Sequence, residues 1–116
     1  KIPLVWKNAS DHQPRISYYL LDGSGGKGKF DINELINSLN KYLKYNMEYH
    51  YIGTLGIAGG LCSDNVFDVC QSIEAILGHK NFSIDAEGKL RTEDRQHLNL
   101  AECKKYITNY ARFYKT

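Results

Sequence analysis

Hydrophobic side chains recur at three- and four-residue spacing along several stretches of this chain, which is the period of an amphipathic α-helix. The clearest stretch covers residues 31–45, where Asp31, followed by Glu34, forms a capping-box start. The apolar face of this stretch holds Ile32, Leu35, Ile36, Leu39, Tyr42 and Leu43. The pattern therefore predicts a helix that begins at Asp31.

Two further helices are marked by their capping residues. Ser63 or Asp64 can cap a helix whose apolar face ends before Gly78, a residue typical of helix C-termini. Asn99 precedes the last periodic stretch and has Glu102 at the capping-box position. We therefore predict one helix that ends at Gly78 and a last helix that begins at Asn99.

Residues 48–61 form an apolar stretch in which glycines recur at three- and four-residue spacing, at Gly53, Gly56 and Gly60. On a helix these glycines would form a smooth stripe that lets another backbone approach closely. Each would cost up to about 1 kcal/mol of helix propensity, which tight packing must offset. We expect this stretch to be a helix packed against a neighbour.

Extended structure is expected at the start of the chain and near residue 85. Residues 1–6 and 15–21 are rich in branched and aromatic side chains, although residues 15–21 are equally compatible with a helix. Residues 82–90 alternate around a turn at residues 85–88, which predicts a β-hairpin. The fold class expected is therefore mainly α: a bundle of about four helices with a short β-hairpin and an extended N-terminal segment. Residues 1–116 fit a single domain.

Composition and charge narrow the classes of function. Hydrophobic residues make up 42% of the chain, and no apolar run approaches the roughly 20 residues that a membrane span needs. The net charge is +2, with 15 basic and 13 acidic residues intermixed, which gives no broad field for a polyanion. We expect a soluble protein whose partner is neither nucleic acid nor membrane. A mature exported protein would also begin without Met, so a periplasmic or secreted location is permitted.

The three cysteines lack the paired spacing of a zinc site. Cys70 and Cys103 lie on the apolar stripes of two predicted helices, so we predict a disulfide between them. Cys62 is then left over for a dimer bond or a free thiol. A bond between Cys62 and Cys103, or three buried free thiols in a cytosolic protein, are the alternatives.

No catalytic or metal-binding pattern is complete. None of the four histidines, His12, His50, His79 and His97, belongs to a recognised ligand spacing. The glycine-rich residues 23–28 lack the Gly-Lys-Ser/Thr ending of a phosphate-binding loop, and residues 23–34 lack the carboxylates of a calcium loop. We expect no enzyme, no catalytic residue, no metal and no cofactor. The alternative is a small secreted hydrolase or toxin that uses Cys62 or a histidine pair such as His12 with His97.

Several short segments resemble a family of periplasmic immunity proteins, with which bacteria that carry type VI secretion systems neutralise peptidoglycan amidase effectors. The similar segments are Asp31-Ile-Asn-Glu-Leu-Ile36, Tyr51-Ile52 before small residues at 53–60, Cys62 before Asn65-Val66, and Arg95-Gln-His97-Leu98 before a final helix with Ala101 and Ala111. Residues 82–90 are longer than that pattern, and tyrosine is more frequent. The resemblance implies an exported helical homodimer that blocks the active-site groove of a cysteine amidase with a loop.

The function predicted is therefore immunity: binding and neutralising a secreted cell-wall amidase through a protein–protein interface. Exposed tyrosines supply large and stiff contact area, which favours a protein partner. The predicted partner-binding residues are Tyr45, Tyr49, His79, Lys80, Asp85, Glu87 and Lys89.

Overall fold

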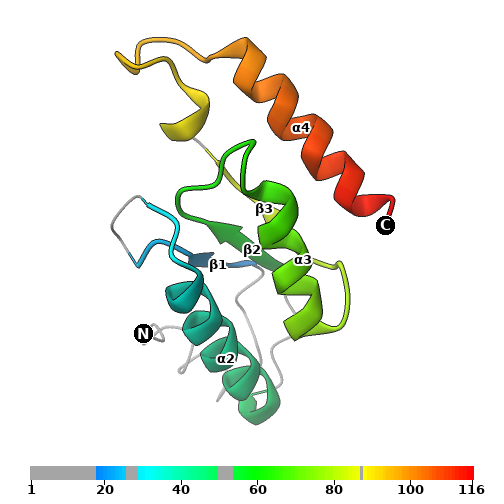
Figure 1. The fold of residues 1–116 in the computed structure, drawn as a ribbon. Coiled ribbons are helices and arrows are strands. Elements are labelled where there is room, and N and C mark those ends of the chain that lie inside the picture. The colour runs from blue at the N-terminus through cyan, green and yellow to red at the C-terminus, as the bar shows by residue number, and fades with distance from the viewer. Residues whose placement is uncertain (1–17, 26–28, 50–53, 87) are drawn as a thin grey trace.

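The computed structural model describes residues 18–25, 29–49, 54–86 and 88–116, in which strands and helices alternate along the chain (Figure 1). The strands are β1 (Tyr18–Asp22), β2 (Thr54–Ala58) and β3 (Ser83–Ile84). The helices are α2 (Ile32–Tyr49), α3 (Val66–Leu77) and α4 (Leu100–Tyr114), and a short 3₁₀ turn covers Gly88–Leu90. This order of elements is typical of α/β proteins with a parallel sheet.

The strands of the described residues form one three-stranded parallel sheet in the order β1-β2-β3. Tyr19 of β1 lies beside Leu55 of β2, Leu21 lies beside Ile57, and Ile57 also pairs with Ile84 of β3. Parallel neighbours need a crossover connection, which α2 and α3 supply here. Because all the strands run in one direction, they end at the same edge of the sheet, which we call the carboxyl edge.

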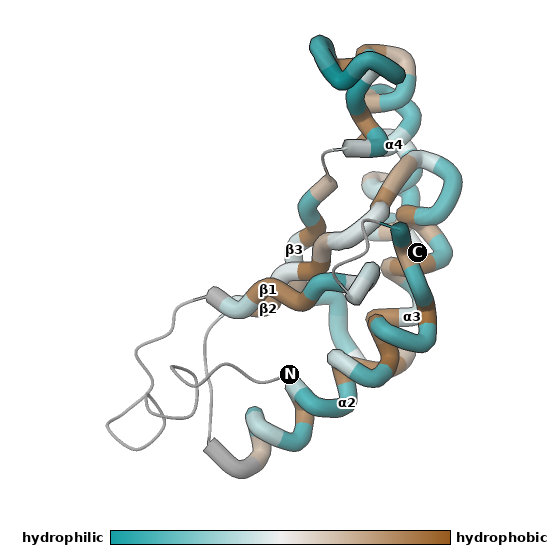
Figure 2. Tube along the Cα trace, turned by 90° about the vertical axis from the view of Figure 1, so that its left-hand side faces the viewer, coloured by the Kyte–Doolittle hydropathy of each residue, from teal (hydrophilic) through white to brown (hydrophobic). Residues whose placement is uncertain are grey.

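Helices α2 and α3 lie on the same side of the sheet (Figure 2). Alternate side chains of a strand point to opposite faces, and those facing the helices form the core with apolar residues of α2 and α3. This core includes Tyr19, Leu21, Leu35, Leu39, Leu55, Ile57, Val66, Val69 and Ile73. On the other face of the sheet Leu20 is 46% exposed. The helix layer therefore buries one face of the sheet.

Helix α4 packs against α3 (Figure 1). Phe113 of α4 is fully buried, and the Arg112 guanidinium lies 4.0 Å from the centre of the Phe67 ring on α3. The chain reaches α4 through the 3₁₀ turn and a loop closed by a single antiparallel bridge between Arg91 and Leu98. This path places the start of α4 close to the carboxyl edge.

The predicted fold class, a mainly α bundle of about four helices with a hairpin, is wrong. The described residues form three helices and a three-stranded parallel sheet, which is an α/β fold. The main error lies at residues 48–61, because residues 54–58 of the predicted helix form β2, which pairs with both neighbouring strands. Such a central strand carries no alternation of apolar and polar residues that would reveal it.

The predicted hairpin at residues 82–90 is also wrong, because β3 pairs in parallel with β2. The backbone N–H of Asp85 extends this pairing by donating to the Ile57 carbonyl at 2.9 Å. Beyond the strand, Gly88–Leu90 forms the 3₁₀ turn instead of a returning strand. The alternating pattern therefore predicted a strand correctly at residues 83–84. This strand pairs with β2, which is distant in sequence, and not with a neighbouring hairpin strand.

Three of the four predicted helix boundaries that rest on caps are confirmed. The predicted cap at Ser63 or Asp64 is wrong, because α3 begins at Val66 with Asn65 at its N-cap. The Asp31 carboxylate accepts a hydrogen bond from the Asn33 N–H at 2.9 Å, Asn99 caps α4, and Gly78 ends α3 with a φ of 82°. Residues 15–21, predicted as extended, overlap β1, whereas residues 1–6 lie outside the described residues. In the part of the chain that the structure describes, no helix is long and apolar enough to cross a membrane.

Candidate functional site

A pocket of about 410 Å³ opens at the carboxyl edge, between the loop that follows β2 and the segment that follows β3. Its volume falls within the range of about 300–1,000 Å³ typical of small-molecule sites. In open parallel sheets, ligands bind beyond the carboxyl ends of the strands. We call it the edge pocket, and its lining residues are Ala58, Gly59, Gly60, Leu61, Asp85, Ala86, Gly88, Lys89 and Arg95.

Gly59 and Gly60 make the sharp turn at the end of β2, and both have positive φ angles, 102° and 76°. A methyl group on Gly59 would lie 2.7 Å from the backbone nitrogen of Ser24, and one on Gly60 would meet the backbone nitrogen of Phe30. Only glycine avoids both the strained backbone and the collision. The loops after β1 and β2 therefore pack backbone against backbone, which fixes this wall of the pocket.

The backbone N–H groups of Gly59, Gly60 and Leu61 donate to no other described residue. Asn65 braces this turn from the start of α3. Its Oδ1 accepts a hydrogen bond from the Cys62 N–H at 2.9 Å, and its Nδ2 donates to the Gly60 carbonyl at 3.1 Å. Asn65 therefore fixes the turn that forms this wall of the edge pocket.

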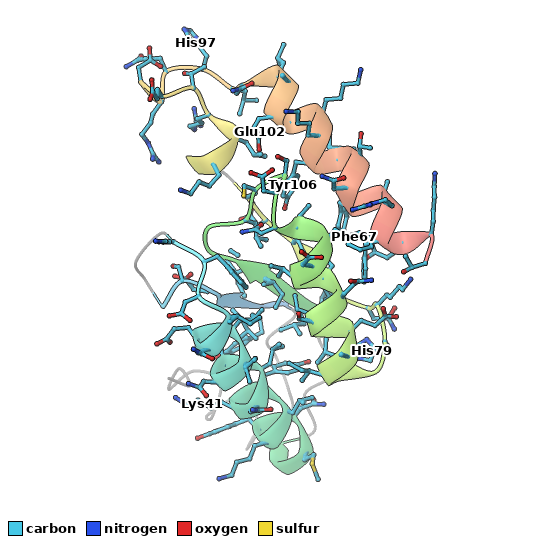
Figure 3. All side chains as sticks on the ribbon, in the orientation of Figure 1. Lys41, Phe67, His79, His97, Glu102 and Tyr106 are labelled. Carbon is cyan, nitrogen blue, oxygen red and sulfur yellow. The ribbon has the colours of Figure 1, made fainter. Side chains whose placement is uncertain are left out.

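Helix α4 holds the same loop through Ser63. The Ser63 N–H donates to Oε2 of Glu102 at 3.1 Å, and Nδ2 of Asn109 donates to the Ser63 carbonyl at 2.8 Å. Figure 3 shows Glu102 on the side of α4 that faces this loop. The hydrogen bond from Ser63 lowers the pKa of Glu102 below its ordinary value of 4.5. Glu102 therefore secures a loop next to the pocket as an ionised carboxylate.

Three ionisable side chains line the edge pocket: Asp85, Lys89 and Arg95. Within the described residues, none of these side chains has a hydrogen-bond or ion-pair partner. Two positive charges against one negative charge leave the pocket positive. The charges are therefore available to a ligand rather than committed to one another.

Tyr106 of α4 places a buried hydroxyl near Asp85. This hydroxyl has no hydrogen-bond partner among the described residues, and Tyr106 is 8% exposed. Burial raises the pKa of the Tyr106 phenol, and the Cys70 thiol and the Asp85 carboxylate raise it further. The phenol is therefore neutral at physiological pH and can donate one hydrogen bond to water or to a ligand.

The predicted partner-binding residues lie on separate parts of the fold. Asp85 and Lys89 line the edge pocket, whereas His79 and Lys80 follow the C-terminal end of α3 (Figure 3). Of the remaining three, Tyr45 is half-buried on α2, Tyr49 is the last residue of α2, and Glu87 lies outside the described residues.

The predicted disulfide between Cys70 and Cys103 is wrong, because all three cysteines are free. Cys70 is fully buried on α3, and burial raises the pKa of its thiol to about 12. The Sγ atom of Cys103 lies 3.8 Å from the carbonyl oxygen of Leu90, so it faces the 3₁₀ turn rather than Cys70. Positions on two apolar helix faces were not enough to bring the two sulfur atoms together.

Histidines do not form a cluster in the described residues. Figure 3 shows His79 below α3 and His97 at the loop before α4, far apart in the fold. His12 and His50 lie outside the described residues, so the suggested pair of His12 with His97 stays a prediction. Among the described residues, no group of three or more His, Cys, Asp or Glu side chains could hold a metal ion.

Gly59, Gly60 and Arg95 are among the lining residues that were not predicted to contribute to a site. The signal for the glycines was present, since a short apolar run, a glycine pair and a capped helix follow one another at residues 55–66. The predicted helix at residues 48–61 hid this strand–turn–helix pattern. For Arg95 no local signal exists, because only the folded chain brings it beside Gly88.

A scan against protein-family models and searches of curated proteins and of solved structures found no match to the chain.

Proposed function

We propose that the protein binds a small metabolite with a phosphate group in the edge pocket. The observation that supports this is that residues 59–61 line the same pocket as the positively charged Lys89 and Arg95. Lysine and arginine side chains are recurring phosphate ligands, and backbone N–H groups of glycine-rich turns can add to them. Two cationic side chains suit the double charge of a phosphate monoester better than the single charge of a carboxylate.

Asp85 restricts the remainder of the ligand. Its carboxylate lines the same pocket as the cations and accepts hydrogen bonds only. A second anionic group placed there would be repelled, whereas a hydroxyl or amino group would be bound. The ligand class that fits is therefore a phosphorylated compound with hydrogen-bond donors at a distance from the phosphate.

An NMR titration with inorganic phosphate tests this proposal. We expect the amide signals of Gly59, Gly60 and Leu61 to shift and saturate, while the Gly78 signal, at the opposite end of α3, stays unchanged. Sodium chloride at the same ionic strength should give no saturating shift. Silent amides at residues 59–61 would refute the proposal.

Two matched variants locate the charge that matters. Lys89→Ala should weaken phosphate binding about tenfold, which corresponds to about 1.4 kcal/mol. Lys104→Ala removes the same charge from an exposed position on α4, outside the pocket, and should leave the affinity unchanged. Equal weakening by both variants would mean that phosphate responds to overall charge and not to the edge pocket.

The immunity function implied by the resemblance stays a prediction. The helical fold that the resemblance implied is not found in the described residues. Protection of cells from a co-expressed cell-wall amidase would support that role. If Lys89→Ala protected as well as the unaltered chain, protection would be independent of the edge pocket.

A further inference from the structure

Arg95 has an unusual backbone conformation at the mouth of the edge pocket. Its φ is 62°, and no other non-glycine residue in the described part of the chain has a positive φ. This left-handed region crowds Cβ against the backbone, so residues other than glycine, asparagine and aspartate seldom occupy it. A strained residue that lines a pocket is a candidate for a functional role.

The loop of residues 91–98 holds Arg95 in this conformation. The Arg95 N–H donates to the Thr92 carbonyl at 2.8 Å, and the Thr92 N–H donates to the His97 carbonyl at 2.8 Å. Asp94 ties the two sides together, because its Oδ1 accepts from the Thr92 hydroxyl at 2.6 Å and from the Gln96 N–H at 3.0 Å. The conformation of Arg95 is therefore imposed by a closed set of hydrogen bonds.

Gly88 leaves the space that the Arg95 side chain uses. A methyl group built on Gly88 would lie 3.3 Å from Nη2 and 3.4 Å from Nη1 of Arg95. A methyl group at residue 88 would therefore require the guanidinium to shift slightly from its present position. Among the described residues, the guanidinium has no hydrogen-bond or ion-pair partner there, so its N–H groups remain available.

We propose that the loop of residues 91–98 fixes the backbone conformation of Arg95 before a ligand binds, and that Arg95 determines the specificity of the edge pocket for oxyanions. This inference rests on the proposed phosphate site. The planar guanidinium can donate two parallel hydrogen bonds to neighbouring oxygens of one phosphate group, which a lysine ammonium cannot do. Asp94 and Gly88 are positioning residues, because they act only through Arg95.

Substitution of Arg95 separates geometry from charge. Arg95→Lys keeps the positive charge but loses the two parallel donors, so we expect phosphate to bind about tenfold more weakly, with little change in chloride binding. If the unaltered protein binds phosphate at residues 59–61 and Arg95→Lys binds equally well, the inference is overturned while the proposed function stands. If the unaltered protein does not bind phosphate, both are overturned.

Substitutions of Gly88 and Asp94 distinguish an effect on phosphate binding from an effect on stability. Gly88→Ala meets only the flexible end of Arg95, so it should leave the melting temperature unchanged or raised while weakening phosphate binding several-fold. Asp94→Ala should weaken binding, and Asp94→Asn should restore it, because its carboxamide oxygen can still accept from Thr92 and Gln96. Unchanged affinity in Gly88→Ala and Asp94→Ala would refute the role of the loop.

A measurement without ligand tests the preformed state. The ¹⁵N relaxation of the Arg95 backbone amide should show a rigid backbone in the free protein, and more motion after Asp94→Ala. Lys104→Ala, a substitution on the exposed surface of α4, is the distant control. A mobile Arg95 backbone in the unaltered protein would overturn the inference.

Discussion

Gly59 and Gly78 share a positive φ angle, 102° and 82°, but they differ in surroundings. A methyl group on Gly59 would lie 2.7 Å from the Ser24 nitrogen, whereas one on Gly78 would find no atom within 4 Å. We expect Gly59→Ala to lower the free energy of unfolding by about 2–4 kcal/mol, from strain plus collision. Gly78→Ala should cost about 1 kcal/mol, from strain alone. Urea unfolding measures both, and equal losses would contradict the close packing of the loops after β1 and β2.

Glu102 should make stability depend on pH through its bond to Ser63. A group whose pKa is lower in the folded than in the unfolded state stabilises the fold above its unfolded pKa. This stability is lost as the pH falls through the folded pKa. Because the pKa of Glu102 is lowered from 4.5, the advantage of the unaltered protein over Glu102→Gln should be complete at neutral pH and decline below pH 4.5.

Unfolding experiments at a series of pH values measure that difference. Glu93→Gln is the control, because Glu93 is exposed and its carboxylate has no hydrogen-bond partner among the described residues. A difference for Glu102→Gln that stays constant down to acid pH would show that the charge of Glu102 does not contribute.

At the scale of elements, the helices could be predicted because their signals are local. Asp31 and Asn99 lie beside the helices that they cap, and both accept the expected backbone hydrogen bonds. The strands were harder, since Ile57 pairs with Leu21 on one side and Ile84 on the other, both distant in sequence. Parallel pairing leaves no turn signal of the kind that marks a hairpin. That is why β2 was mistaken for a helix and β3 for part of a hairpin.

Lys80 connects the segment after α3 to the end of α4. Its Nζ donates to the Phe113 carbonyl and the Thr116 hydroxyl, both at 3.1 Å, and lies 4.8 Å from the centre of the Phe113 ring. A cation at a helix C-terminus binds carbonyls that have no partner in the helix. We expect Lys80→Met to lower the free energy of unfolding by about 1–2 kcal/mol.

The expected site of this effect is the last turn of α4, where amide hydrogen exchange should become faster. Lys104→Met, exposed on the same helix, should change stability by less than about 0.5 kcal/mol. Equal effects of the two variants would contradict a specific role for Lys80.

At the scale of the whole molecule, the edge pocket combines segments that the sequence does not place together. Asp85 and Lys89 were found because polar residues around a turn are candidates for contact, although the contact expected was with a protein. Their neighbours in the pocket, Gly59 and Gly60, could not be found once residues 48–61 were assigned to a helix. A correct prediction of the sheet from the sequence would have placed Asp85 and Gly59 at the same edge, because parallel strands end at the same edge.

The reactivity of the three cysteine thiols can be used to follow unfolding, because the cysteines are buried to different degrees. Cys70 is fully buried, whereas Cys62 and Cys103 are half-buried. We expect a thiol reagent to find three free thiols in the unfolded protein without prior reduction, since no cysteine is paired. A single alkylated thiol in the mass spectrum of the monomer would mean that an internal disulfide exists after all.

In the native protein, Cys70 should react only when the molecule opens, because its thiol is buried and its pKa is raised to about 12. A slow phase of alkylation should therefore be present in the unaltered protein and absent from Cys70→Ser. If phosphate binds the native state, it lowers the open population, so the slow phase should become slower as phosphate is added. Lys89→Ala should reduce this protection. A Cys70 thiol that reacts as fast as Cys62 would contradict the buried position of Cys70 in the core between the sheet and its helices.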